Sequence, residues 1–395
     1  MQRPPLLVAV YLPTALLAFA QGSLLATLPL HVADEFDVSN ALVGLAVAAA
    51  ALGTLVTDVP AGALLGRLGL RPAMILGSAL VALGTLALAV AGSFPELVAF
   101  RVAAGIGSAL WGLSRHAYIA EVVPIAQRGR AISVFGGINR IGVFGGPAIG
   151  GAVGAAFGLE ASFVLAGVFA LVALALSVLF IKPAAAPERP LAARARWRLV
   201  GQLVRTSGRD LSAAAFAQTF AQMLRAGRQL IIPLYGTSIG LDAASIGLVM
   251  TVSALLDVSM FVPAGQLMDR FGRKAAAVPS FGVMAVGVGL IPLTSNYGEL
   301  MAAAALIGLG NGLGSGTMMT LGADLAPPGA TGEFLGLWRL VGDTGGVGGP
   351  LAVGIVADEL GLDGSAVVIA GLGLAATLTL AFLVRETRQS PLDAT

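Results

Sequence analysis

Twelve long apolar runs constrain the fold of this chain more than any other feature of its sequence. A helix that crosses a bilayer needs about 20 mostly apolar residues. Only 11% of the residues are charged, whereas a soluble domain carries about a quarter, so lipid must solvate much of the chain. The first run is longer than the apolar core of a cleaved signal peptide, and we read it as an uncleaved helix. The expected spans are residues 7–30, 41–65, 72–92, 97–120, 131–157, 161–181, 211–236, 244–268, 275–294, 299–323, 333–357 and 365–384.

The positions of lysine and arginine predict how these spans are oriented, because both residues favour the cytoplasmic side of a membrane. With both termini inside, the inner segments hold 17 of the 23 basic residues, and the outer loops hold none. The charges of the outer loops are all acidic. The sequence therefore predicts a multi-pass protein of the cytoplasmic (inner) membrane with both termini in the cytoplasm.

An internal repeat relates the two halves of the chain. Adding 203 to a position in the first half repeatedly gives a matching residue in the second half. Matched pairs include Gly62 and Gly265, Gly69 and Gly272, Gly105 and Gly308, Glu121 and Asp324, and Gly146 and Gly349. We expect two pseudo-symmetric six-helix bundles, residues 1–182 and 210–395, joined by a cytoplasmic linker at 183–209. A solvated linker without a specific partner is favoured over one whose short basic piece lies on anionic lipid.

Two copies of one loop pattern carry a resemblance to a known family. Residues 62–71 contain Gly62, Arg67, Gly69 and Arg71, and the second copy at 265–274 contains Gly265, Asp269, Arg270, Gly272 and Arg273. Both resemble the loop signature of the major facilitator superfamily, the second in full. In the first copy Gly66 stands where the family usually has an aspartate.

Two further motifs extend the resemblance. Arg101 and Gly105 in the fourth span are similar to the family's arginine motif. The fifth span resembles the antiporter motif of drug–proton exporters through Gly142, Gly146, Pro147, Gly150 and Gly151. The resemblance implies the twelve-helix fold, alternating access and a transport path between the bundles. It also implies that Asp269 latches the cytoplasmic side near Gly129 to Ala131. The alternative is that the loop charges only set topology.

Charged residues inside the spans need a reason, since each costs at least about 2.5–3.5 kcal/mol at the bilayer centre. They lie only in spans two, four, five, seven, eight and eleven. In the superfamily, spans three, six, nine and twelve are the outer spans that face lipid, and none of them carries such a charge here. The intramembrane charges are Asp58, Arg101, Arg115, Arg140, Arg225, Arg228, Asp257, Arg339 and Asp343.

Two interpretations of these charges remain open. In the first, Arg140, Arg225 and Arg228 contact an anionic or zwitterionic amphiphile, with Gln21, Asn311 and Trp111 also lining the path. In the second, the charges form buried ion pairs that hold helices together, and Trp111 only packs. For proton coupling the candidates, in order, are Asp343, Asp257 and Asp58, because a desolvated carboxylate near an arginine can titrate between two access states.

The sequence thus predicts a secondary active transporter, of the antiporter, efflux or multidrug-resistance type. Its substrate would be a small amphiphilic compound, anionic or zwitterionic under the first of these interpretations, exported in exchange for protons. The alternatives are an organic-anion importer or facilitator and, more remotely, a membrane enzyme or sensor. The chain has no cysteine and only two histidines, so we expect no metal site and no cofactor. Its sequence shows no nucleophile–base pair and no carboxylate dyad at catalytic spacing, so we expect no enzyme activity. We further expect a monomer in the lipid bilayer that binds its substrate and protons and no nucleic acid.

Overall fold

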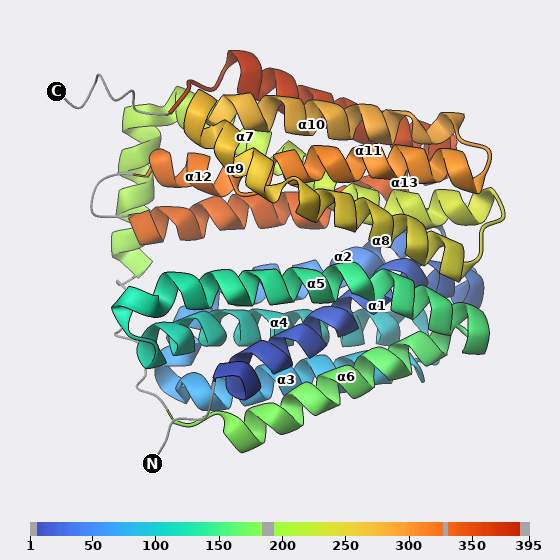
Figure 1. The fold of residues 1–395 in the computed structure, drawn as a ribbon, viewed down its shortest axis with the longest axis horizontal. Helices are drawn as coiled ribbons and strands as arrows, with labels where there is room; N and C mark the ends of the chain where they lie inside the picture. Colours follow the sequence, from blue (N-terminus) through green and yellow to red (C-terminus); the bar gives the residue numbers. More distant parts are fainter. Residues whose placement is uncertain (1–5, 184–192, 327–330, 388–395) are drawn as a thin grey trace. The chain divides into compact units, whose positions relative to one another are not determined.

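The computed structural model describes residues 6–183, 193–326 and 331–387, which form helices and turns without a strand (Figure 1). In the first half a short π-helix at Leu7–Tyr11 precedes the first α-helix. The helices of this half are α1 (Leu12–Phe36), α2 (Asn40–Leu68), α3 (Leu70–Leu88), α4 (Phe94–Val122), α5 (Ile125–Phe157) and α6 (Leu159–Phe180). Helices are the expected solution for apolar segments in lipid, because each one satisfies its own backbone hydrogen bonds.

The second half has the same plan with more interruptions. A short 3-10 helix at Ile291–Leu293 connects α10 to the turn before α11. The helices of this half are α7 (Ala193–Ser238), α8 (Ala243–Ser259), α9 (Phe261–Phe271), α10 (Arg273–Gly289), α11 (Tyr297–Leu313), α12 (Thr317–Asp324) and α13 (Thr331–Phe382).

The long helix α13 contains two spans. Its backbone leaves the helical conformation at Gly361, with φ 72° and ψ 174°. The pseudo-equivalent position is Gly158, with φ 94° and ψ 154°, and it separates α5 from α6. Ten stretches of the described residues are long and apolar enough to cross a membrane, the α13 stretch being one of them. With that stretch counted as two spans, and with α7, the twelve expected helices are all present.

Two expected spans are not continuous. Span eight breaks at Met260 into α8 and α9, and span ten breaks at Gly314–Gly316 into α11 and α12. The expected linker at 183–209 overlaps the start of α7. Residues 184–192 lie outside the described part, and from Ala193 onward the backbone is helical and continuous with span seven.

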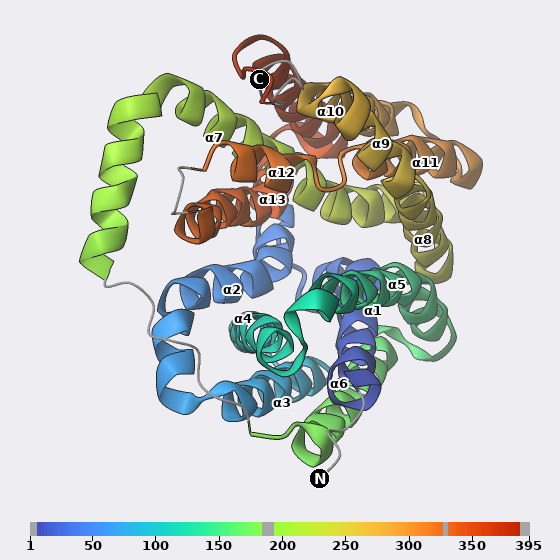
Figure 2. The same cartoon turned by 60° about the vertical axis from the view of Figure 1, so that its left-hand side comes forward.

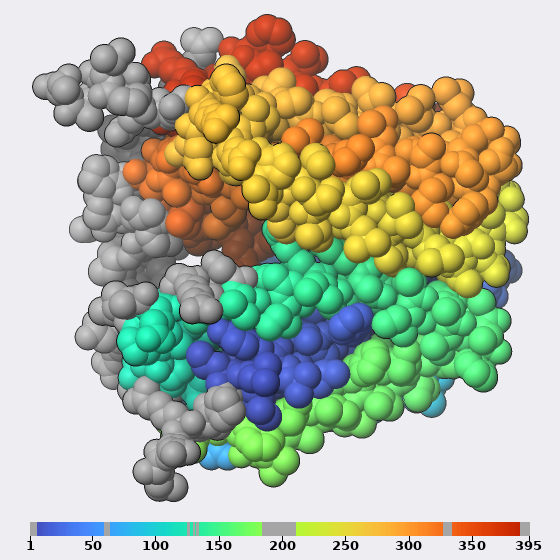
Figure 3. Space-filling view, in the orientation of Figure 1, coloured from blue at the N-terminus to red at the C-terminus, as the bar shows by residue number. Residues whose placement is uncertain are grey.

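The chain forms two compact units, and each contains most of one sequence half. The first comprises Met1–Pro190 and Gly236–Thr251, and the second comprises Leu191–Tyr235 and Val252–Thr395. In the first unit α4 lies between α2 and α3, as Figure 2 shows. The surface of α1 is flanked by α5 and α6 in the space-filling view of Figure 3.

Close packing inside each unit repeats with the same offset of 203 residues. A Cβ on Gly105 would meet the backbone of Ala50, and a Cβ on Gly308 would meet that of Ser253. Ser162 donates to the Gly150 carbonyl at 2.7 Å, and its counterpart Ser365 donates to the Val353 carbonyl at 2.8 Å. These two contacts therefore recur at equivalent positions in both bundles.

Candidate functional site

A cluster of polar side chains lies inside the second unit, where three spans meet. Arg225 and Arg228 come from α7, Asp257 from α8 and Asn311 from α11. Arg228 Nη2 lies 3.8 Å from Asp257 Oδ2. The Asn311 amide donates to the same carboxylate and accepts from Arg225 Nε at 2.9 Å. Asn311 thus connects Arg225, which is cationic, with Asp257, which is acidic.

The Arg225 guanidinium is held by neutral oxygen acceptors and an aromatic ring. Nη1 donates to Gln222 Oε1 at 3.2 Å, and Nη2 donates to the Gly314 carbonyl at 3.0 Å. The guanidinium carbon lies 4.9 Å from the centre of the Phe281 ring, within the range of a cation–π contact. These contacts fix the orientation of the side chain before any ligand arrives.

The break in span ten explains why a carbonyl is available to Arg225. The helix α11 ends at Leu313, and Gly316 adopts a left-handed conformation with φ 79°, which glycine tolerates without steric cost. The Gly314 carbonyl follows the end of α11 and also accepts from the backbone amide and the hydroxyl of Thr317, at 3.2 Å and 2.8 Å. Carbonyls at the C-terminal end of a helix carry partial negative charge, so a guanidinium is a favourable further partner. Half-helices that end beside polar groups are typical of binding sites in transporters.

The first unit has no comparable cluster at the equivalent positions. Arg225, Arg228, Asp257 and Asn311 correspond to Gly22, Leu25, Thr54 and Ser108. The Thr54 hydroxyl is 3.1 Å from the Ala50 carbonyl of its own helix and 3.1 Å from the Gly105 carbonyl of α4. The same helix packing therefore forms without charge in the first unit. The cluster is an addition to the fold of the second unit, which favours a functional role over a purely structural one.

The charged members of the cluster are two guanidinium groups and one carboxylate. Asp257 is 3% exposed. Within the described part of the chain, Arg228 Nε is buried and has no hydrogen-bond partner. A buried donor without a partner is costly. An acceptor on a bound ligand would satisfy it, so Arg228 is equipped to bind an anionic or carbonyl oxygen.

The other expected site residues are not members of this cluster. Trp111 is 3% exposed and its backbone packs on Gly77 of α3, while Gln21 is exposed. Arg140 and Asp58 are partly buried members of the first unit. Asp343 Oδ2 lies 3.6 Å from Arg339 Nε on the same helix, the i,i+4 pairing that the sequence allowed.

The loop motif has the expected turn in both copies. Gly69 has φ 81° and Gly272 has φ 99°, values that a residue with a Cβ rarely adopts. Arg71 donates to the Val178 carbonyl at 3.1 Å, and its counterpart Lys274 donates to the Ala381 carbonyl. Asp269 and Arg270 end α9 as exposed residues, Gly265 precedes them in α9, and Gly62 and Arg67 lie in α2. The side chains of residues 129 and 130, near the expected latch position of Asp269, lie outside the described part.

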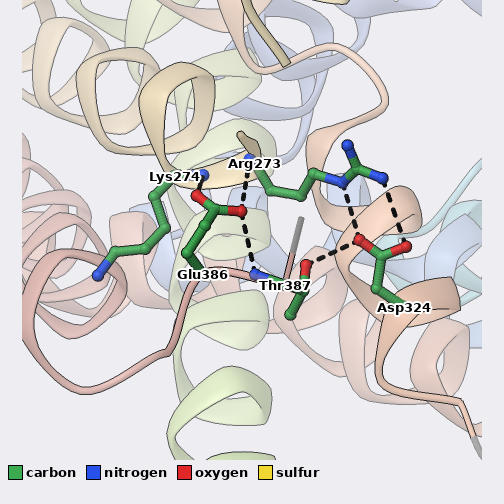
Figure 4. A network of polar contacts seen from close by, with 5 residues as sticks. All are labelled: Arg273, Lys274, Asp324, Glu386 and Thr387. Atoms are coloured by element: carbon green, nitrogen blue, oxygen red, sulfur yellow. Dashed lines mark hydrogen bonds and ion pairs between the residues drawn. The ribbon is translucent and has the colours of Figure 1, made fainter. Parts of the chain in front are cut away.

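The second copy of the loop motif also takes part in a polar network (Figure 4). Arg273 Nε donates to Asp324 at 2.8 Å, and Thr387 donates to the same carboxylate at 2.7 Å. The Glu386 carboxylate accepts from the backbone amides of Arg273 at 2.8 Å and Lys274 at 3.0 Å. It therefore occupies the N-terminus of α10, where negative charge is favourable.

The glycines of the span-five motif face two different helices. Gly142, Gly146 and Gly150 form one face, where a Cβ would meet the backbone of α1. Gly151 faces Ala243 at the start of α8 instead. In the span-four motif, Gly105 packs on Ala50 of α2, and Arg101 Nε donates to the Ala46 carbonyl at 3.4 Å. Both motifs thus support close helix packing.

Sequence reasoning missed several members of these sites. Gln222 precedes Arg225 by three residues, so the helical periodicity could have placed both side chains on one face. The role of the Gly314 carbonyl and of Glu386 depends on where a helix ends, which the apolar pattern does not show. Phe281 comes from span nine, which carries no charge to attract attention.

Comparisons with known proteins agree with this architecture. The family model described as Major Facilitator Superfamily matches residues 10–224 and again residues 211–395. The multidrug resistance protein MdtH of Aeromonas salmonicida is 25% identical over 337 residues, which are 85% of this chain and 83% of the relative. An uncharacterized MFS-type transporter of Methanocaldococcus jannaschii is 21% identical, over 84% of this chain and 86% of its own length.

Solved structures show the same fold. The crystal structure of a D-xylose–proton symporter has a TM-score of 0.79 at 18% identity, over 97% of this chain and 98% of that one. The human organic anion transporter MFSD10 has a TM-score of 0.68 at 20% identity, over 96% of this chain and all of that one. At these identities the likeness concerns the fold alone.

Proposed function

Because the chain belongs to the major facilitator superfamily, and is therefore a membrane transporter of small molecules rather than an enzyme, we propose that it exports a small amphiphilic compound in exchange for protons. In this proposal Arg225, Arg228 and Asn311 contact the substrate and Asp257 carries the proton. The export direction is supported by the relatives named as multidrug resistance proteins and by the span-five motif.

The single observation that carries the proposal is the absence of this cluster from the equivalent site of the first unit. The close helix approach at Gly105 recurs at Gly308, but the chemistry differs, and α2 and α4 are continuous at the positions where α8 and α11 end. A buried carboxylate between two guanidinium groups costs free energy that hydrophobic residues of similar volume would not. Leu25 and Thr54 show that such residues fit at these positions. The cost is understandable if the charges serve binding and coupling.

Exchange with protons requires that substrate and proton compete for the carrier. Asp257 provides this competition when the substrate bears a positive or hydrogen-bond-donating group, since the same carboxylate oxygen cannot accept both at full strength. Binding of one then weakens binding of the other by the same factor, which is the reciprocity of linked equilibria.

A second candidate, uptake of an organic anion together with a proton, is favoured by the excess of guanidinium groups over carboxylate. An anion would replace Asp257 as the partner of Arg228. Protonation of Asp257 would weaken its bond to Arg228 and so strengthen binding of the anion. Proton and anion would then travel in the same direction, and the sign of coupling would be opposite to that of the exporter.

Flux in proteoliposomes distinguishes the two candidates. The probes are a fluorescent amphiphilic cation and a fluorescent amphiphilic carboxylate, each tested with an imposed pH gradient. Exchange should concentrate the cation on the acidic side, whereas co-transport should concentrate the carboxylate on the alkaline side. Flux that ignores the gradient for both probes would contradict proton coupling.

Variants that copy the first unit test the site itself. Asp257→Thr should remove the response to the pH gradient, and Arg228→Leu should lower flux at least about tenfold, as expected for a lost charged hydrogen bond. Glu359→Gln, an exposed acid elsewhere in α13, serves as the matched control and should leave flux unchanged. Normal flux in both cluster variants would remove the cluster from the transport path.

The remaining expectations stay predictions. They include substrate contacts by Arg140, Gln21 and Trp111, proton coupling by Asp343 and Asp58, and the latch at Asp269. The domain limits, the inner-membrane location with cytoplasmic termini, and the monomeric state also belong to this group.

A further inference from the structure

Thr251 of α8 makes an unusual contact with the backbone of α5. Its hydroxyl accepts a hydrogen bond from the Ala148 amide at 3.0 Å and donates one to the Phe144 carbonyl at 3.0 Å. Phe144 and Ala148 are four residues apart, so this amide and this carbonyl are the pair that an α-helix normally joins directly. The Thr251 side chain therefore joins both members of one backbone pair in another helix.

The local sequence of α5 makes this turn receptive to an outside hydroxyl. Pro147 lies immediately before Ala148 and has no N–H, so the adjacent helical hydrogen bond is absent. Small residues allow α8 to approach. A Cβ on Gly247 would meet the Pro147 carbonyl, and a Cβ on Gly151 would meet the Ala243 carbonyl. Ala243, Gly247 and Thr251 are spaced by four residues and share one face of α8.

The hydroxyl is not a requirement of the fold. The pseudo-equivalent of Thr251 is Ala48 in α2, which is fully buried and has no hydroxyl. Thr251 is also the last residue of α8 that belongs to the first compact unit, since Val252 belongs to the second. The residues of α8 on the two sides of this boundary therefore pack mainly with different units.

We propose that Thr251 is a positioning residue whose hydroxyl holds α8 on α5 in one state of the transport cycle and releases it in another. On release the Ala148 amide bonds to the Phe144 carbonyl, and the Thr251 hydroxyl bonds to the Gly247 carbonyl of its own helix, as threonine does in helices. The contact can therefore be made and broken without leaving a polar group unsatisfied in an apolar setting.

The conservative variants separate this role from simple packing. Thr251→Val keeps the shape and removes the hydroxyl, so the held state loses two bonds while the released state keeps the bond within α5. Thr251→Ser keeps the hydroxyl. The matched control is Thr219→Val in the second unit. It removes a hydroxyl of α7 that bonds to the Ala215 carbonyl of the same helix and to the Val341 carbonyl of α13.

The chain has no cysteine, so spin labels can be placed at Phe157→Cys and Leu248→Cys alone. These side chains are exposed on α5 and α8. Pulsed electron paramagnetic resonance on this doubly labelled protein in nanodiscs, recorded at two pH values, should show a short and a long distance between the two labels. Thr251→Val should lower the ratio of the short-distance population to the long-distance population at least about fivefold. Thr251→Ser and Thr219→Val should match the parent.

Two results would overturn the proposal. One is a distance distribution in Thr251→Val that equals that of the parent. The other is an equal shift in Thr219→Val, which would point to a general effect of lost hydroxyls. If Thr251→Val does not fold, Gly247→Ala serves instead. Its added methyl group meets the Pro147 carbonyl and should favour the long distance, and an unchanged distribution in this variant would contradict the proposal equally.

Discussion

Asn311 is the residue on which the polar cluster of the second unit depends most. Its carbonyl oxygen accepts from Arg225 and its amide donates to Asp257, so one neutral side chain links two groups of opposite charge. An asparagine suits this position because it has both donor and acceptor capacity. Neither arginine nor aspartate could replace it without changing the charge of the site.

We expect Asn311→Ser, which copies the residue of the first unit, to lower the free energy of unfolding by about 1–3 kcal/mol. The physical reason is that Arg225 and the buried Asp257 each lose a hydrogen-bond partner. Denaturant unfolding in detergent measures the change. Ser108→Ala, at the exposed equivalent position, is the control and should change stability by less than about 0.5 kcal/mol. Equal stabilities of both variants would contradict the central role of Asn311.

The residues of the site could be predicted individually, but their partners could not. Charges inside apolar spans identify Arg225, Arg228 and Asp257 from sequence, because each is costly in lipid. Their convergence on Asn311 depends on how three helices rotate about their axes. The sequence repeat gives no help here, since the first half has Gly22, Leu25 and Thr54 at the matching positions.

At the scale of helices, the glycines determine how closely the spans approach. A Cβ on Gly308 of α11 would meet the Ser253 carbonyl of α8, while a Cβ on Gly265 would meet open space. We expect Gly308→Ala to destabilise the protein by about 1–3 kcal/mol, the usual cost of overpacking. Gly265→Ala is the control. The melting temperature in detergent reports both, and a stable Gly308→Ala variant would show that α8 and α11 can move apart freely.

The start of α8 depends on a cap whose strength varies with pH. Asp242 accepts a hydrogen bond from the Ser245 amide at 2.8 Å. Hydrogen bonds from the Ser245 hydroxyl and amide lower the pKa of Asp242 from its ordinary value. Its stabilisation is therefore present above the unfolded pKa, about 3.9, and is lost as pH falls through the lower folded value.

We expect Asp242→Ala to cost about 0.5–2 kcal/mol at neutral pH, as for other N-cap residues. The difference from the parent protein should shrink when unfolding is measured below about pH 3.5. Ser39→Ala, the equivalent position before α2, makes no side-chain cap bond and should show no such pH dependence. A constant difference across pH would mean that the carboxylate charge is unimportant.

Helix positions followed from the sequence better than helix continuity did. The apolar runs gave the spans within a few residues because each span must cross the same thickness of lipid. The breaks at Met260 and at Gly314–Gly316 lie inside runs that remain apolar on both sides. Hydropathy cannot detect a break when the residues that cause it are themselves small or apolar.

At the scale of the whole molecule, the described end of the chain is tied to the second bundle. Glu386 occupies the N-terminus of α10, and Thr387 joins Asp324 at the end of α12 (Figure 4). The first half has Pro183 and Leu70 where the second has Glu386 and Arg273. This network is therefore a second feature, after the polar cluster, that distinguishes the two halves.

We expect Glu386→Gln to weaken the first turn of α10, because a neutral amide is a poorer acceptor for backbone N–H groups at a helix N-terminus. Hydrogen exchange followed by mass spectrometry should show faster exchange at Arg273 and Lys274. Glu359→Gln should leave these amides unchanged. Unaltered exchange in Glu386→Gln would show that the contact contributes little.

Left-handed residues at 37 and 240, at 69 and 272, and at 158 and 361 occur in both halves at one constant spacing. Matching turns of this kind mean that the two halves are built on one common backbone plan, and at the four cluster positions only the second half carries ionic side chains. A chain that carries the first-half residues at these four positions should therefore still assemble as a membrane protein, but it would lack the substrate contacts that we propose for Arg225, Arg228 and Asn311.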